Sequence, residues 1–297
     1  MSELHTETTD TTTGTAGTGS TGSTGQAGAP GRAAIEAELV EAVAATQGSP
    51  LLRRIGPFMP IALLLIWEVS GRVGLLDERF FPVPTSIVGT FLEMLTSGDL
   101  FDDASITLTR IAIGFTMGAV PGVLLGLLLG SVRPLRQLLE PVFSSLLPIP
   151  KIAIFPLLLL IFGLGETSKY LIVAIGVFFY LFFNTLTGVM QTPPLYNDVA
   201  VANGASPLQR RLTVSLPHAL PSIFTGTKLA AGGAFVIIAA AEFVGSQSGL
   251  GYLIWSAWST FAVSKMYVGI VTISVLGYVV TLLIGLLERK LVPWVKY

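Results

Sequence analysis

The chain has 297 residues, of which 52% are hydrophobic and only 12% are charged, against roughly 25% charged in soluble proteins. A net charge of −1 provides no basic surface for nucleic acid. The absence of cysteine excludes disulfides and thiolate metal sites, and two histidines, His5 and His218, argue against a histidine-based centre. Composition therefore predicts a membrane protein.

The first 50 residues differ in composition from the rest of the chain. Thr6 to Gly31 is almost entirely threonine, glycine, serine and alanine, which is too polar and flexible to bury a core. We expect residues 1–50 to form a disordered cytosolic tail with no assigned function, and residues 51–297 to form the membrane domain.

Six apolar segments follow, each near the ~20 residues that cross the hydrocarbon of a bilayer. Because backbone groups in lipid must be paired within the segment, helices are expected throughout, and the predicted fold class is all-α and polytopic. The predicted spans cover residues 52–70, 107–130, 140–162, 170–190, 218–243 and 267–287. An amphipathic helix is expected over Thr85–Leu95.

The second predicted span has a glycine at every fourth position from Gly114 to Gly130. These glycines share one helix face and would let a neighbouring helix approach closely. A surface that slides during gating is the alternative interpretation.

Basic residues predict which side of the membrane each loop faces. Six spans place both termini on one side, and the side with more lysine and arginine is cytoplasmic. Ten basic residues fall on one face: Arg32, Arg53, Arg54, Arg133, Arg136, Arg210, Arg211, Arg289, Lys290 and Lys296. Four fall on the other: Arg72, Arg79, Lys169 and Lys265. Both termini and the loop at about residues 192–217 are therefore predicted to be cytosolic.

That loop contains a long polar segment, residues 198–217, between two apolar ones. It reads as a short helix that stops at Gly204, because glycine adopts a left-handed cap at little cost. A second short helix is expected to begin with Ser206 as its cap and Pro207 at its first position. Leu216-Pro217 is expected to end this helix before the next span.

The same segment resembles the E-A-A motif of the permease subunits of bacterial ATP-binding-cassette importers. Asp198 takes the place of the acid, Val199 and Ala200 those of the alanines, and Gly204 that of the glycine, although the family's usual residues are glutamate and two alanines. In that family the loop docks into a groove on a separate ATPase. The resemblance implies that the coupling residues are Asp198, Ala200, Gly204, Ala205, Ser206, Pro207, Arg210, Arg211, Leu216 and Pro217.

Four polar residues in or near the spans are candidates for the translocation path or a gate. Lys151 and the pair Asn184 and Thr185 are polar enough to line a conduit, although lysine can reach the interface and the pair can form interhelical hydrogen bonds. Glu242 either bonds to the glycine turn that follows it or lines the path, because acids in membrane spans face a partner or a pathway.

The resemblance extends to the nitrate/sulfonate/taurine branch of these permeases, through Pro148–Pro156, Phe162–Lys169, Ala241-Glu242 and Gly249–Tyr252. It implies a type I importer fold in a prokaryotic cytoplasmic membrane, a homodimer in lipid, two ATPase subunits that bind ATP and Mg²⁺, and an extracytoplasmic substrate-binding protein. This chain is then expected to have no catalytic, cofactor or metal site, and it contains no G-x-x-x-x-G-K-[ST] loop.

Three alternatives from other classes remain at this stage. An ion-coupled secondary transporter would need inverted repeats or paired broken helices, which the sequence does not clearly contain. A passive channel would need a polar ring along a pore. A membrane anchor or assembly factor would explain the apolar spans but not the spacing of the 198–217 loop.

Overall fold

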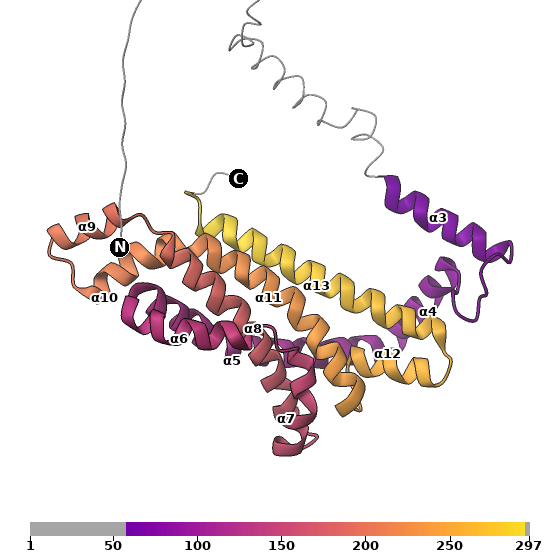
Figure 1. Cartoon of the computed structure of the whole chain (residues 1–297). Helices are drawn as coiled ribbons and strands as arrows, with labels where there is room; N and C mark the ends of the chain where they lie inside the picture. Colours follow the sequence, from indigo (N-terminus) through magenta and orange to yellow (C-terminus); the bar gives the residue numbers. More distant parts are fainter. Residues whose placement is uncertain (1–57, 295–297) are drawn as a thin grey trace, which may run out of the picture. The chain divides into compact units, whose positions relative to one another are not determined.

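A computed structural model describes residues 58–294 of the chain. The regular structure of these residues is helical (Figure 1). The predicted tail, residues 1–50, and the start of the first predicted span lie outside these residues. The chain divides into two units, Met1–Pro60 and Ile61–Tyr297, and the second contains nearly all of the described residues. No strand occurs among the residues described, in agreement with the all-α prediction.

The helices follow one another with short connections (Figure 1). In chain order they are α3 (Met59–Arg72), α4 (Pro84–Ser97), α5 (Asp99–Ser131), α6 (Arg133–Leu146), η2 (Lys151–Ile154), α7 (Phe155–Phe162), α8 (Glu166–Met190), α9 (Pro194–Ala202), α10 (Pro207–Arg210), η3 (Arg211–Ser215), α11 (Leu216–Gly245), α12 (Leu250–Ser259) and α13 (Val263–Leu291). Helix α4 confirms the helix expected over Thr85–Leu95.

Four helical segments in the described part of the chain are long and apolar enough to cross a membrane. They are Asp99–Ser131, Glu166–Met190, Pro207–Gly245 and Val263–Leu291. They correspond to the second, fourth, fifth and sixth predicted spans. The first predicted span is described only from residue 58 onward, where α3 contains its apolar second half.

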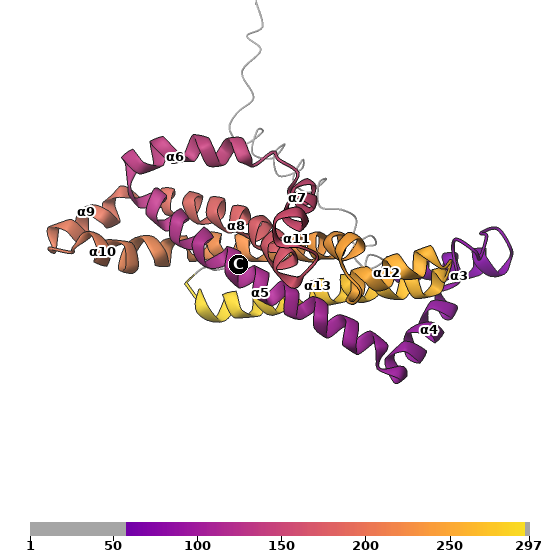
Figure 2. The ribbon, with the colours of Figure 1, turned by 90° about the horizontal axis from the view of Figure 1, so that it is seen from below.

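The third predicted span, 140–162, is wrong as a single straight helix. Helix α6 and the segment Lys151–Phe162 meet at an angle of 83°. The break contains Pro148 and Pro150, and proline both lacks an N–H donor and excludes the helical conformation at the residue before it. The pair is therefore a broken span or a re-entrant segment (Figure 2).

The core lies around α8. Val173, Val177 and Leu181 of α8 pack with Ala234 and Ile238 of α11 in one apolar cluster. In the most apolar part of each helix, 61% of the residues of α8 are buried in the chain, whereas none of those of α13 are. Helix α8 is therefore central, and α13 presents an apolar face to lipid or to another protein.

The glycine row of α5 packs directly on α8. A Cβ added at Gly114 would lie 2.8 Å from the carbonyl oxygen of Tyr170, and one at Gly122 would lie 2.9 Å from that of Phe178. Gly130, at the far end of the row, lies against Val189. The row is thus a close helix-packing surface, as its four-residue spacing predicts.

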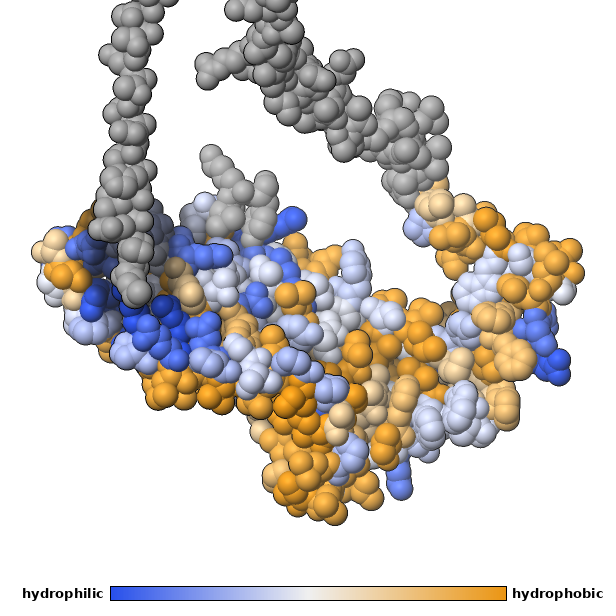
Figure 3. All heavy atoms as spheres, in the orientation of Figure 1, coloured by the Kyte–Doolittle hydropathy of each residue, from blue (hydrophilic) through white to orange (hydrophobic). Residues whose placement is uncertain are grey.

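Hydrophilic and hydrophobic surfaces lie on different parts of the described chain. Hydrophilic residues gather at the end of α8 and α11 that carries α9 and α10, whereas the surface of α7 is hydrophobic (Figure 3). Leu160 and Ile161 of α7 are among its most exposed apolar side chains. This distribution fits a membrane protein whose α9–α10 segment lies outside the hydrocarbon.

Candidate functional site

Helix α9 ends in the glycine cap that its sequence predicts. Gly204 has φ +75°, in the left-handed region. The amide of Gly204 donates to the carbonyl of Val201 at 2.9 Å, and the amide of Ala205 donates to that of Ala200 at 3.0 Å. These two bonds form a complete Schellman motif, which fixes the direction in which the chain leaves α9.

Ser206 caps α10, as predicted, and the cap has a second component. The Ser206 hydroxyl accepts from the amide of Gln209 at 3.3 Å, and the Gln209 side chain accepts from the amide of Ser206 at 2.8 Å. Pro207 occupies the first turn, where no N–H is needed. The Ser-Pro-Leu-Gln spacing is a capping box that the sequence interpretation missed, although the sequence contains its signal.

The prediction that Leu216-Pro217 ends the second helix is wrong. The chain passes from α10 through the π-helical turn η3 into α11, so that Pro207–Gly245 is helical throughout. The amide of Leu216 bonds to the carbonyl of Arg211, five residues back. This wider turn accommodates Pro217, which has no N–H to bond to a carbonyl four residues back.

The α9–α10 segment and the adjoining turn η3 expose apolar side chains at the hydrophilic end of α8 and α11 (Figure 3). Leu208 is 62% exposed. The others with large exposed areas are Leu195, Tyr196, Val199, Val201 and Leu212. Several large exposed apolar side chains on one short segment suit a protein interaction site.

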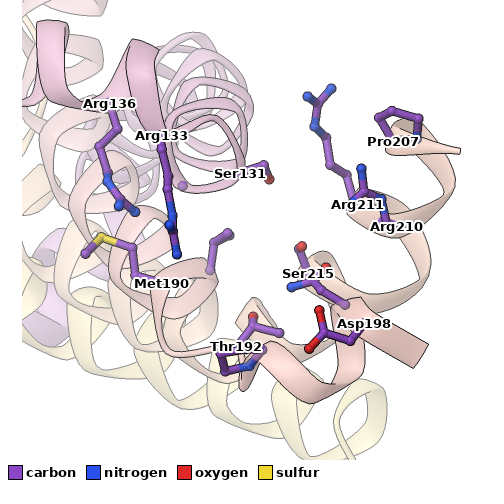
Figure 4. Close-up of a pocket in the computed structure, with 14 residues that line it drawn as sticks. Ser131, Arg133, Arg136, Met190, Thr192, Asp198, Pro207, Arg210, Arg211 and Ser215 are labelled. Carbon is purple, nitrogen blue, oxygen red and sulfur yellow. The ribbon is translucent and has the colours of Figure 1, made fainter. Parts of the chain in front are cut away.

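A cleft of about 480 Å³ separates this segment from the corner between α5 and α6. Arg133 and Arg136 stand on one wall, and Arg210 and Arg211 stand on the other (Figure 4). Asp198 also lines this cleft, which we call the basic cleft. The structure thus brings the acid of the predicted coupling loop and both of its arginines to one place.

The candidate path residues Lys151, Asn184 and Thr185 have separate surroundings. Lys151 Nζ donates to the carbonyl of Leu147 and lies 4.9 Å from the centre of the Phe179 ring. Asn184, half-buried, donates to the carbonyl of Tyr180 at 2.8 Å in its own helix. Thr185 is fully buried, and its hydroxyl has no partner within the described chain. Their role in a path stays a prediction.

Glu242, fully buried, belongs to an ion-pair cluster (Thr107, Arg110, Glu166, Glu242) in which only the Glu166 side chain is exposed, by 46%. Arg110 Nη1 lies 2.7 Å from Glu242 Oε1, and Arg110 Nε lies 2.6 Å from Glu166 Oε2. The Thr107 hydroxyl donates to Glu242 at 3.0 Å. Because the charges are mutually paired and hydrogen-bonded, the cluster joins α5, α8 and α11 at the end opposite to α9 and α10.

The glycine turn after α11 completes this cluster. The amide of Gly251 donates to Glu242 Oε2 at 2.8 Å, and the amide of Leu250 donates to the Thr107 hydroxyl at 2.9 Å. Glu242 therefore makes the hydrogen bond to the glycine turn that was one of its two sequence interpretations. Arg110 and Glu166 were not selected from the sequence, since nothing in their spacing reveals that they meet.

Comparisons with known proteins agree with this architecture. A model of the family described as "Binding-protein-dependent transport system inner membrane component" matches residues 122–293. The putative aliphatic sulfonates transport permease SsuC of Bacillus subtilis is 36% identical over 239 residues, which cover 80% of this chain and 87% of that protein. The nitrate import permease NrtB of Leptolyngbya laminosa is 32% identical, over 67% of this chain and 71% of that protein. The riboflavin permease RibX of Chloroflexus aurantiacus is 33% identical, over 86% and 98%.

A solved structure shows the same fold at lower sequence identity. The chain of an inward-facing MetNI methionine ABC transporter superposes with a TM-score of 0.57 at 21% identity, and the match covers 62% of this chain and 92% of that one. Together with the family match and its sulfonate- and nitrate-permease relatives, this likeness identifies the chain as a multi-pass member of the binding-protein-dependent inner membrane components, the permease subunits of ATP-binding-cassette importers.

Proposed function

We propose that the α9–α10 segment couples this permease to a separate ATPase subunit on the cytosolic face, and that the solute is a small sulfonate- or nitrate-like anion. The names of two of the relatives support the choice of anion. ATP and Mg²⁺ are then bound by the ATPase and not by this chain. A second copy of the chain and an extracytoplasmic binding protein complete the proposed importer.

The observation that carries the coupling proposal is the exposed apolar surface of α9 and α10. Leu208 and Leu212 are exposed in the first turns of the helical segment Pro207–Gly245, at the hydrophilic end of the described chain (Figure 3). The Schellman motif at Gly204 and the capping box at Ser206 hold the two helices in a fixed relation. A rigid apolar knob of this kind suits a groove on a partner protein.

The helical segment Pro207–Gly245 gives the proposed coupling its mechanical path. Its 39 residues form a rod of roughly 58 Å, at 1.5 Å per residue. One end is α10, and the other end holds Glu242 in the ion-pair cluster with Arg110. A displacement of α10 by the ATPase would therefore be transmitted to the far end of the bundle.

The test is uptake into proteoliposomes that contain the assembled importer. We expect Leu208→Asp to abolish co-purification of the ATPase and to reduce ATP-dependent uptake at least about tenfold, because the charge would be desolvated in the groove. Leu164→Asp is the matched control, since Leu164 is 71% exposed at the opposite end of α8. Normal uptake by the Leu208 variant would contradict the proposal.

The same assay separates the proposed function from its rivals. Uptake of ethanesulfonate or nitrate that requires ATP and the binding protein is the expected result. Uptake driven by an ion gradient without ATP would instead show a secondary transporter. No uptake of any tested anion, with ATPase binding intact, would show that the choice of solute class is wrong while the coupling surface is right.

A further inference from the structure

The basic cleft collects more positive charge than its own acids balance. Four arginines line it, against the single aspartate Asp198. Of these four arginines, only Arg136 has an ion-pair partner among the described residues, Glu140, at 3.9 Å. Like charges that converge on one partly enclosed space repel one another, and the repulsion favours an anion between them.

Two polar atoms in the walls of the cleft have no partner within the described chain. Thr192 is 8% exposed, and its hydroxyl is buried without a hydrogen bond. The Nε of Arg210 is also buried and unpartnered. Both residues line the cleft. Because buried polar atoms in folded proteins are almost always hydrogen-bonded, the two atoms indicate a ligand with acceptor oxygens.

We propose that the basic cleft binds a phosphate- or sulfonate-type oxyanion between the α5–α6 corner and the α9–α10 segment. Guanidinium groups match the oxygens of such anions in a two-pronged geometry, and Arg133 and Arg211 come from opposite walls of the cleft (Figure 4). A cleft of about 480 Å³ exceeds the needs of a bare phosphate and suits an anion that carries an organic group. The assignment does not depend on which solute is transported.

The position of the cleft allows two sources for this oxyanion. It opens beside Ser131 at the end of α5 and Met190 at the end of α8, where two apolar spans end. An anionic lipid headgroup at the membrane surface and a free anion in solution both reach this level. A bound oxyanion from either source would tie the α10–η3 segment to α6.

The experiment uses the whole importer in phosphatidylcholine nanodiscs and measures binding by titration calorimetry. Inorganic phosphate and ethanesulfonate are the free probes. Nanodiscs with 20–30% phosphatidylglycerol, roughly the anionic content that gives a bilayer its surface charge, supply the lipid probe, which is measured by native mass spectrometry. We expect at least one probe to bind, and Arg133→Gln and Arg211→Gln each to weaken its binding about tenfold.

The matched control is Arg289→Gln, which removes the same charge from an exposed site in the last turn of α13 that does not line the cleft. We expect this variant to bind like the native protein. Loss of free-anion binding in the cleft variants assigns a soluble ligand, and loss of lipid retention alone assigns a headgroup. Equal effects of all three substitutions, no binding of any probe, or binding to the isolated chain that vanishes when the ATPase is present would overturn the proposal.

Discussion

At the scale of single residues, Gly249 decides whether Arg110 and Glu242 can meet in the ion-pair cluster. Its φ is +101°, which only glycine adopts readily, and an added Cβ would lie 2.5 Å from Glu242 Oε1 and 2.7 Å from Arg110 Nη1. An alanine would therefore strain the backbone and also separate a buried pair of charges. The geometry of one glycine thus controls the join between three helices.

We expect Gly249→Ala to lower the free energy of unfolding by about 3 kcal/mol or more, of which about 1–2 kcal/mol is backbone strain and the rest is disruption of the pair. Gly74→Ala is the control, because Gly74 has φ +77° but no atom lies within 4 Å of the added Cβ. Thermal midpoints of the detergent-solubilised variants compare the two. Equal losses would show that the contact with Glu242 contributes nothing.

The residue scale also shows what the sequence can and cannot predict. The caps at Gly204 and Ser206 depend on neighbours within five positions, and the structure has them as expected. The ion-pair cluster joins residues up to 135 positions apart, as in the bond from Thr107 to Glu242. Spacing along the sequence does not indicate which distant residues come into contact, so Arg110 and Glu166 could not be chosen as site residues.

At the scale of helices, the row of glycines fixes the distance between α5 and α8. A Cβ at Gly118 would meet the backbone of Ala174, and would lie 2.9 Å from its Cα atom. Backbone cannot rotate away as a side chain can, so the two helices would have to separate. Packing of this kind is sensitive to the addition of one methyl group.

We expect Gly118→Ala to destabilise the protein by about 1–3 kcal/mol, the usual cost of overpacking. The matched control is Gly232→Ala in α11, where nothing lies within 4 Å of the added Cβ. That change should be neutral or stabilise by about 0.5–1 kcal/mol, because alanine favours helix. Thermal unfolding in detergent measures both, and an unaffected Gly118 variant would contradict the packing argument.

The helix scale is also where two sequence predictions were wrong. Both errors concern proline. Pro148 and Pro150 break a predicted span, whereas Pro217 fails to break a helix because η3 widens the turn before it. Proline excludes an ordinary α-helical turn, but whether the chain bends or shifts its hydrogen bonds depends on the packing of the flanking segments. That packing is not visible in the sequence.

At the scale of the whole molecule, the division of polar and apolar surface predicts how the chain sits in the membrane. Leu208 and Leu164 lie on connections at opposite ends of α8 and α11. The excess of arginine and lysine predicts that Leu208 lies on the cytosolic side. Since the chain has no cysteine, each position can be tested by a single substitution.

We expect Leu208→Cys to react with a membrane-impermeant maleimide only in inside-out vesicles, and Leu164→Cys only in right-side-out ones. Both side chains are more than half exposed in the chain alone, so the labelling uses the permease expressed without the ATPase that would cover Leu208. The modified fraction is read from a mass shift on a gel. The reverse pattern would invert the orientation and remove the ATPase from the proposed coupling surface.

The close packing of the glycine row of α5 on α8 has a consequence for the segment that connects the two helices. The chain leaves α5, runs through α6, η2 and α7, and returns at α8, so both ends of residues 133–162 are attached to the same pair of locked helices. Residues 133–162 are therefore a loop whose two ends are held at a fixed separation. This loop also packs back on its anchors: the ring centres of Phe143 and Phe182 lie 4.6 Å apart, and Phe155 shares a buried cluster with Ile172 of α8. A movement of α8 would therefore carry this loop with it.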